Sequence, residues 1–136
     1  MRRRRDDWPA RLSAFVRARE RVPYVHGETD CACFCQAWIL EATGVDVMPG
    51  IDKPRSRMAA ARFLVAGGFG DVEGLATKVL GEPLPYPRLA GRGDIISFEA
   101  EGERHLGVVV GVDAATPGRD GILWVPRVAW INGWRV

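Results

Sequence analysis

The residue pattern of this chain changes once along its length, at a proline-containing link over residues 82–87. Before the link, apolar residues recur with helical spacing, and after it short β-branched and aromatic runs alternate with glycine-containing turns. Helices followed by a series of strands are typical of an α+β domain. Because 136 residues supply one core, we predict a basic tail over residues 1–7 and a single domain over residues 8–136.

Capping residues predict where the helices before the link begin and end. Asp30, Ser56 and Asp71 each precede a helical run and carry a side-chain oxygen that can accept from the first turn. Gly44 supplies a stop for the helix that Asp30 opens. We predict four helices: one from Trp8, capped by Asp7 and ended before Pro23, and three over residues 30–43, 56–66 and 71–80.

The second half of the chain predicts antiparallel strands. Three short runs, over residues 94–99, 105–112 and 121–125, are rich in β-branched or aromatic residues and are separated by turns. The last segment, residues 128–136, holds Trp130 and Trp134 and either adds a strand or closes the core. The Gly-Asp pair before the first run predicts a structural role for Asp94, whose carboxylate would bind nearby backbone N–H groups.

Charge is concentrated at the N-terminus, where residues 1–21 hold eight arginines and three acidic residues. The run Arg2–Arg5 would suit nucleic acid, but such a run is typical of a solvated tail and no basic stripe follows it. No apolar stretch has membrane-spanning length. We therefore predict no specific nucleic-acid partner and no membrane insertion.

Cys31 combines two features of a nucleophilic thiol. It follows Asp30 in the first turn of a predicted helix, where unpaired N–H groups and the helix dipole stabilise a thiolate. A general base is also required, and the only histidines are His26 and His105. We expect His105, at the start of a strand, to be the base, although a buried cysteine that only packs is the alternative.

Three cysteines at positions 31, 33 and 35 are too closely spaced for a disulfide framework, which indicates reduced thiols and synthesis inside a cell. Together with His26 they would form a sufficient zinc ligand set. Alternate residues of a helix diverge in direction, however, and zinc ligands usually come in pairs with two to four residues between them, whereas these cysteines have only one. We predict no metal and no cofactor, and we expect Cys33 and Cys35 to pack in the core.

In order and spacing, four stretches of the sequence resemble the NlpC-type cell-wall endopeptidases, a papain-like family of cysteine peptidases. These stretches are Pro23-Tyr24-Val25-His26-Gly27, Asp30-Cys31, Gly93-Asp94-Ile95-Ile96-Ser97-Phe98 and His105-Leu106-Gly107-Val108-Val109-Val110-Gly111. The resemblance spans about residues 22–125. It implies a papain-like fold in which N-terminal helices, with the nucleophile at a helix N-terminus, pack on a small antiparallel β-meander.

The resemblance also implies roles for individual residues. Cys31 would attack an amide carbonyl, His105 would transfer the proton, and Tyr24 and Asp30 would line the substrate site. His26 stands where the family often has an aromatic residue, so it would lie in a wall of the cleft, with an exposed loop histidine as the alternative. The implied substrate is a peptide bond in the stem peptides of peptidoglycan.

The whole chain, including its closing segment 129–136, resembles a bacteriophage or prophage offshoot of this family that is encoded among tail genes. This resemblance implies local opening of the cell wall during DNA delivery. The expected location is the cytoplasm of the bacterial host on synthesis, followed by incorporation into a virion or tail-like particle, with phage tail proteins as partners.

The sequence departs from the family pattern in two places. Ala32 and Cys33 follow Cys31, where the family usually has Ser and Gly, which leaves substrate specificity open. The run Ile122–Pro126 offers no polar side chain to orient the catalytic imidazole. The groups that remain are a backbone carbonyl, a water molecule, or the side chains of Asp113, Arg127 and Asn132.

Loss of an orienting group lowers the rate of such an enzyme by orders of magnitude while leaving its fold intact. The alternative function is therefore a catalytically inactive papain-like module that serves as a structural or interaction component of a phage tail-like particle.

Overall fold

The computed structural model describes residues 2–136 and confirms the α+β prediction. The four α-helices are α1 (Trp8–Arg19), α2 (Cys31–Thr43), α3 (Arg57–Ala66) and α4 (Val72–Leu80). The five strands are β1 (Ile95–Ala100), β2 (Glu103–Val109), β3 (Asp113–Gly118), β4 (Gly121–Pro126) and β5 (Gly133–Trp134). Two short 3₁₀ helices, η1 (Pro87–Leu89) and η2 (Arg127–Ala129), complete the chain.

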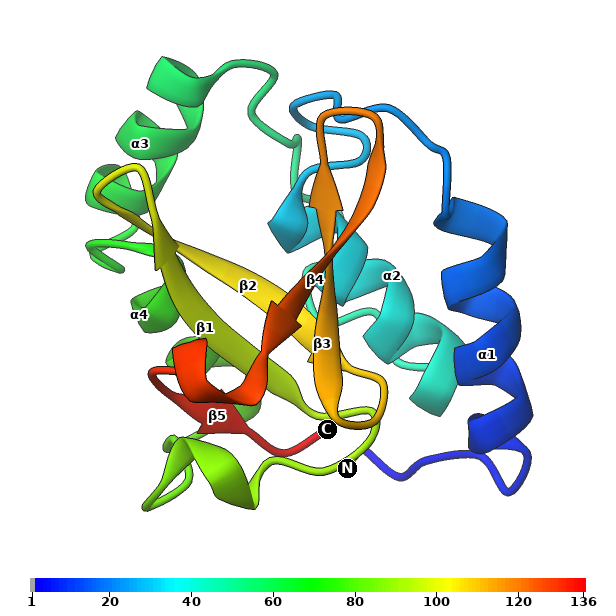
Figure 1. Cartoon of the computed structure of the whole chain (residues 1–136). Coiled ribbons are helices and arrows are strands. Elements are labelled where there is room, and N and C mark those ends of the chain that lie inside the picture. Colours follow the sequence, from blue (N-terminus) through cyan, green and yellow to red (C-terminus); the bar gives the residue numbers. More distant parts are fainter. Residues whose placement is uncertain (1) are drawn as a thin grey trace.

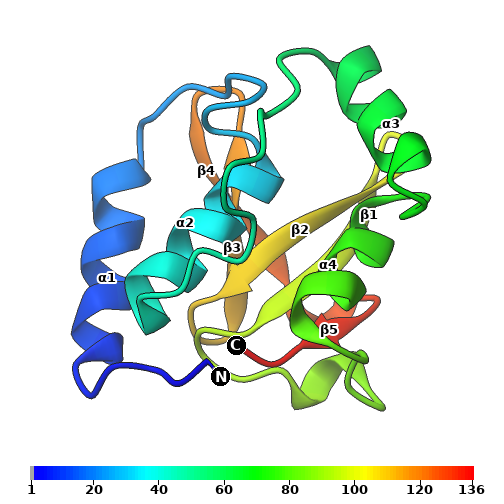
Figure 2. The ribbon, with the colours of Figure 1, turned by 180° about the vertical axis from the view of Figure 1, so that it is seen from behind.

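The strands form one antiparallel sheet in the order β4-β3-β2-β1-β5. Figures 1 and 2 show α1, α2 and α4 against one face of this sheet, with α3 beside the turn of the β1–β2 hairpin. The two ends of the chain lie next to each other in both views.

The side chains predicted to cap three of the helices do so. Asp30 accepts from the N–H of Cys33, Ser56 from the third residue of its helix, and Asp71 from Gly74. The prediction for α1 was wrong in one detail, because Asp7 makes no side-chain cap bond and instead pairs with Arg11.

Two apolar clusters, one on each face of the sheet, form the core. Successive strand residues point to opposite faces, so Ile95 belongs to the cluster under the helices and Ile96 to the cluster on the other face. Trp38 of α2 is fully buried in the first cluster, and its indole N–H donates to the Gly93 carbonyl at 2.8 Å. This bond connects α2 to the turn that precedes β1.

Strand β3 was not predicted, and β2 ends at Val109 rather than at residue 112. The sequence of β3, Asp113–Gly118, resembles a turn because it contains alanine, proline and glycine. It forms a strand because it pairs along its whole length with β4. Its pairing with β2 includes only Ala114 and Ala115, so Pro117 lies where β3 has no ladder partner in β2.

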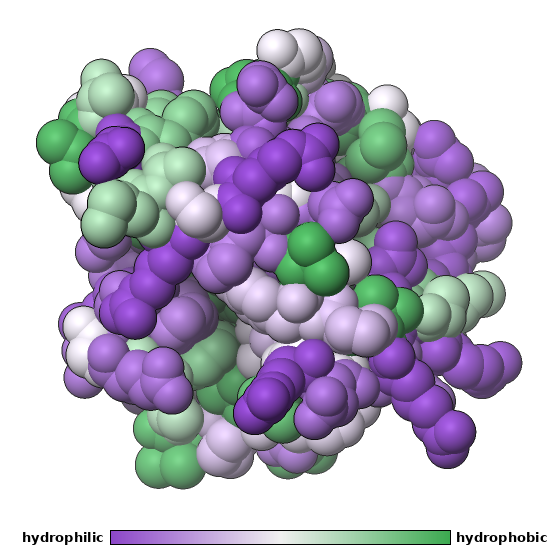
Figure 3. Space-filling view, turned by 90° about the horizontal axis from the view of Figure 1, so that it is seen from above, coloured by the Kyte–Doolittle hydropathy of each residue, from purple (hydrophilic) through white to green (hydrophobic). Residues whose placement is uncertain are grey.

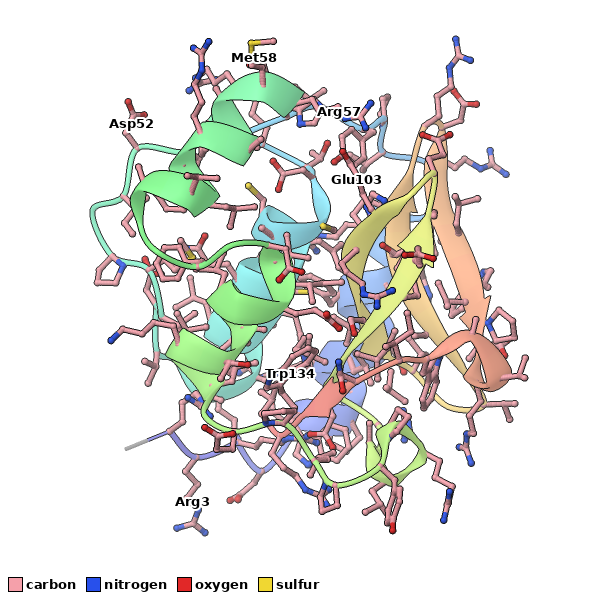
Figure 4. The ribbon with its side chains drawn as sticks, turned by 90° about the vertical axis from the view of Figure 1, so that its left-hand side faces the viewer. Arg3, Asp52, Arg57, Met58, Glu103 and Trp134 are labelled. Carbon is pink, nitrogen blue, oxygen red and sulfur yellow. The ribbon has the colours of Figure 1, made fainter. Side chains whose placement is uncertain are left out.

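Arg4 is not part of a solvated tail, contrary to the prediction for the arginine run. Its guanidinium donates to the Asp94 carboxylate at 2.7 Å and to the carbonyl oxygen of Val136 at 3.0 Å. The Asp94 carboxylate also accepts from the backbone N–H groups of Gly91 and Val136, which confirms its predicted structural role. Arg3, in contrast, is exposed and points away from the domain (Figure 4).

Candidate functional site

Cys31 is the first residue of α2, and its side chain is 7% exposed. The preceding residue, Asp30, connects the helix to the loop before it, because one carboxylate oxygen accepts from Cys33 at 2.9 Å and the other from the N–H of Gly27 at 2.6 Å. Gly27 has a φ of +80°, and a Cβ there would lie 2.8 Å from the Pro54 carbonyl oxygen. The loop therefore has little freedom to move away from the thiol.

Opposing influences act on the pKa of the Cys31 thiol. Burial raises this pKa to about 11, while backbone N–H groups, first that of Leu106 and then those of Ala32 and Cys31 itself, act to lower it. Leu106 lies in the part of β2 that precedes its pairing with β3 at Val108. Burial is the largest of these influences, so the thiol is protonated at neutral pH.

His105 lies on β2, directly before Leu106. Its ring stacks on Phe98 of β1 with a centroid separation of 5.4 Å, and its Nε2 lies 3.2 Å from the carbonyl oxygen of Ala100. A carbonyl can only accept, so Nε2 carries the proton in this contact and Nδ1 is the basic nitrogen. In this resting conformation the unprotonated Nδ1 is the nitrogen that could accept a proton.

The sequence leaves open which group orients the imidazole, and in the resting conformation the polar partner of the His105 ring is the Ala100 carbonyl. The turn of the β1–β2 hairpin presents this carbonyl, and both turn residues, Glu101 and Gly102, have positive φ. Asn132 donates instead to Glu73, and Arg127 lies over the ring of Trp130.

All five residues proposed from the sequence line one cavity of about 410 Å³. It extends from the N-terminus of α2 to α3, α4 and the β1–β2 hairpin, and the five residues are Tyr24, His26, Asp30, Cys31 and His105. Within residues 2–136, however, no hydrogen bond joins the Cys31 thiol to the His105 imidazole. The structure brings nucleophile and base candidates to the same cavity without pairing them.

Tyr24 and His26 form one wall of the cavity. Their rings meet edge to face with centroids 5.1 Å apart. Burial raises the pKa of the Tyr24 hydroxyl, and the negative charge of the Asp30 carboxylate raises it further, so the hydroxyl is neutral and can donate a hydrogen bond.

Cys33 and Cys35 are buried, as predicted for packing residues. Burial raises the pKa of Cys33 to about 12, with the Asp30 carboxylate adding to the effect, and burial raises that of Cys35 well above its usual value. In the part of the chain that the structure describes, no three His, Cys, Asp or Glu side chains gather around a point that would hold a metal ion.

Helix α3 contributes to the cavity in a way that the sequence did not indicate. Its residues lining the cavity include Phe63 and Leu64, yet none of its residues is fully buried. Arg57 at its start binds Glu103 of β2 through two N–H donors at 3.0 and 2.5 Å (Figure 4). The spacing of apolar residues over 57–66 indicates an amphipathic helix. It does not indicate which cavity the apolar side of that helix lines.

The fold and the cavity together define an α+β domain with a cysteine at a buried helix N-terminus and a histidine on the adjacent strand. The chain belongs to the family described as domain of unknown function DUF6950, whose model matches residues 3–136. Among curated proteins, none matches the chain. Across residues 2–136, the helices are too short or too polar for any of them to span a bilayer.

Proposed function

We propose that this protein is a cofactor-independent thiol hydrolase of papain-like architecture that cleaves a peptide or amide bond. The observation that carries the proposal is the position of Cys31, which is the first residue of α2 and lines a cavity that His105 also lines. The resemblance to the NlpC-type endopeptidases supports peptidoglycan stem peptides as the substrate and phage tail-associated cell-wall penetration as the context.

In the proposed reaction, the Cys31 sulfur attacks the amide carbonyl carbon while Nδ1 of His105 removes the thiol proton. Backbone N–H groups at the start of α2 stabilise the oxyanion, and collapse of the tetrahedral intermediate releases the amine, which takes the proton from His105. Water, deprotonated by the same imidazole, then hydrolyses the thioester and restores the thiol. Because burial keeps the resting thiol neutral, proton removal accompanies attack rather than preceding it.

For this step the His105 side chain must leave its contacts with Phe98 and Ala100 and turn toward Cys31. The ring stacking contributes about 1 kcal/mol and a neutral hydrogen bond contributes about 1 kcal/mol. Breaking these two contacts costs about 2 kcal/mol, and the ring must also move from the sheet face where Phe98 packs to the face where Cys31 lies, so the turned conformation accounts for at most about one molecule in thirty. Substrate that binds better to the paired state would raise this fraction.

The alternative is a non-catalytic module of the same architecture that acts as a structural part of a tail-like particle. The observation that favours it is the resting arrangement itself, in which the thiol is buried and protonated while the imidazole has partners of its own. A module of this kind would need neither the thiol nor the imidazole for its activity.

The two functions are separated by digesting purified peptidoglycan with the protein at neutral pH and analysing the products by mass spectrometry. The hydrolase predicts new amine and carboxylate termini that are lost with both Cys31→Ser and His105→Ala. Intact muropeptides, in an experiment where an active NlpC-type enzyme cleaves them, would exclude this substrate. Equal performance of Cys31→Ser and wild type in a particle-assembly assay would support the module.

A further inference from the structure

The walls of the cavity beside Cys31 are mainly apolar. Beyond the five residues already placed, its lining includes seven large apolar side chains from α3, α4 and the segment before α3, namely Met48, Ile51, Phe63, Leu64, Val65, Val72 and Leu75. Ile51 is 39% exposed, and Leu64 and Phe63 are partly exposed although the Phe63 ring lies beside that of Phe69, so part of this apolar surface is open to solvent.

The charged residues around this cavity are mostly paired with groups of the protein itself. Asp30 and Asp71 cap helices, Arg57 and Glu103 bind each other, and Arg104 binds Glu73. Of the six charged lining residues, only Lys53 is outside these interactions. A strongly charged ligand would have to displace existing pairs, whereas an apolar one would not.

Helix α3 is a wall of the cavity rather than part of the core. Figure 4 shows Arg57 pointing toward Glu103 across the space between α3 and the β1–β2 hairpin, while Met58 points away from it. In the view from above, hydrophobic residues gather over α3 (Figure 3). The ion pair holds the start of the helix at the hairpin, and the apolar side chains of α3 line the space behind it.

We propose that this cavity binds a large uncharged apolar side chain of the substrate, aliphatic or aromatic, next to the bond that Cys31 attacks. Because the side chains of peptidoglycan stem peptides are small or charged, this inference favours a different peptide as the substrate of the same thiol. The inference rests on the proposed function only for the position of that bond. A volume of about 410 Å³ lies in the range of small-molecule sites and exceeds what a methyl group would fill. Each additional methylene buried there should strengthen binding about fourfold.

The test uses alkylation of Cys31 by a series of maleimides with N-methyl, N-butyl, N-hexyl and N-benzyl groups. Rates at Cys31 are followed by peptide mass spectrometry and divided by the rate of the same reagent with glutathione, which removes differences in intrinsic reactivity. We expect the normalised rate to rise at least tenfold from methyl to hexyl. A flat or falling series would overturn the proposal.

Two variants connect the effect to the cavity. Leu64→Gln keeps side-chain size, places an amide in the wall, and should reduce the hexyl-to-methyl ratio by at least threefold. Leu123→Gln is the matched control, because Leu123 is 59% exposed on β4 and is not part of the lining, and it should leave the ratio unchanged. An equal ratio in wild type and Leu64→Gln, with circular dichroism showing both folded, would contradict the proposal.

The outcome does not depend on catalysis. The same series with His105→Ala should keep its preference for apolar reagents even if every rate falls, so the pocket and the base are tested separately. Should Cys31 react too slowly to measure, binding of N-phenyl-1-naphthylamine to the Cys31→Ser protein is followed by fluorescence. Saturable binding that weakens with Leu64→Gln but not with Leu123→Gln supports the site, and equal binding by all three proteins overturns it.

Discussion

Replacing Asp94 by alanine should destabilise the fold more than any exposed charge substitution. The carboxylate is 1% exposed and accepts from Arg4 at 2.7 Å, from the N–H groups of Gly91 and Val136 at 2.9 and 3.0 Å, and from Arg135 at 3.3 Å. The Arg135 guanidinium is 65% exposed and contributes little, so the Arg4 contact and the two N–H groups account for most of the effect.

The expected loss of unfolding free energy is about 3–5 kcal/mol, because removing one member of a buried ion pair leaves the other without compensation. Burial lowers the pKa of Arg4, while the Asp94 charge opposes this effect, so the guanidinium depends on the carboxylate that the substitution removes. Asp94→Asn keeps one acceptor oxygen and should lose less, about 2 kcal/mol.

Urea unfolding followed by tryptophan fluorescence measures both losses, and Trp38, which binds the Gly93 carbonyl next to Asp94, provides a nearby probe. Asp7→Ala is the control, because Asp7 forms an exposed ion pair with Arg11, and its midpoint should stay close to wild type. A loss below about 1 kcal/mol for Asp94→Ala, at unchanged m-value, would refute the view that this carboxylate anchors both chain ends.

Two further substitutions test the surroundings of the site. Phe98→Leu removes the ring that stacks on His105, so the imidazole should turn toward Cys31 more often and alkylation of Cys31 at neutral pH should rise about two- to tenfold; an unchanged or lower rate would argue against the turn. Burial tends to raise the pKa of Glu73, but hydrogen bonds, of which that from Ser97 is the largest influence, hold this pKa below its usual value. The ionised Glu73 carboxylate therefore stabilises the fold at pH values above its unfolded pKa, and this contribution is lost as the pH falls through the folded pKa. The urea midpoint of wild type should therefore fall more steeply than that of Glu73→Gln between pH 6 and pH 3, roughly the range around a carboxyl pKa, and parallel profiles would contradict this assignment.

Local rules predicted the helices well because their signals are local. A carboxylate or hydroxyl followed by a helical apolar pattern places a helix start within a residue or two, as Asp30, Ser56 and Asp71 did. Strand β3 was not predicted because its sequence favours a turn. It is a strand because it pairs with β4, which is a contact between distant residues that the local sequence does not indicate.

The site was predictable in its members but not in its arrangement. Cys31 and His105 were chosen by residue chemistry and by resemblance, and the fold brings both to one cavity. The contact between the Ala100 carbonyl and the resting imidazole depends on the geometry of a hairpin turn. A backbone carbonyl is present at every residue, so the amino-acid sequence does not indicate this contact. The apolar wall formed by α3 depends on how that helix sits against β2, which its own sequence does not specify.

The central claim, that His105 activates Cys31, is tested most directly by the rate of Cys31 alkylation by iodoacetamide between pH 6 and pH 11, roughly the range up to its raised pKa, in wild type and His105→Ala. Peptide mass spectrometry separates Cys31 from Cys33 and Cys35. We expect Cys31 to react fastest of the three cysteines and His105→Ala to slow its alkylation about tenfold or more near pH 7. The difference in rate between wild type and His105→Ala should disappear near pH 11, roughly where hydroxide ionises the thiol without a base. Slow alkylation of Cys31 that is the same with and without His105 across this range would contradict the account and leave a fold whose function is binding or assembly.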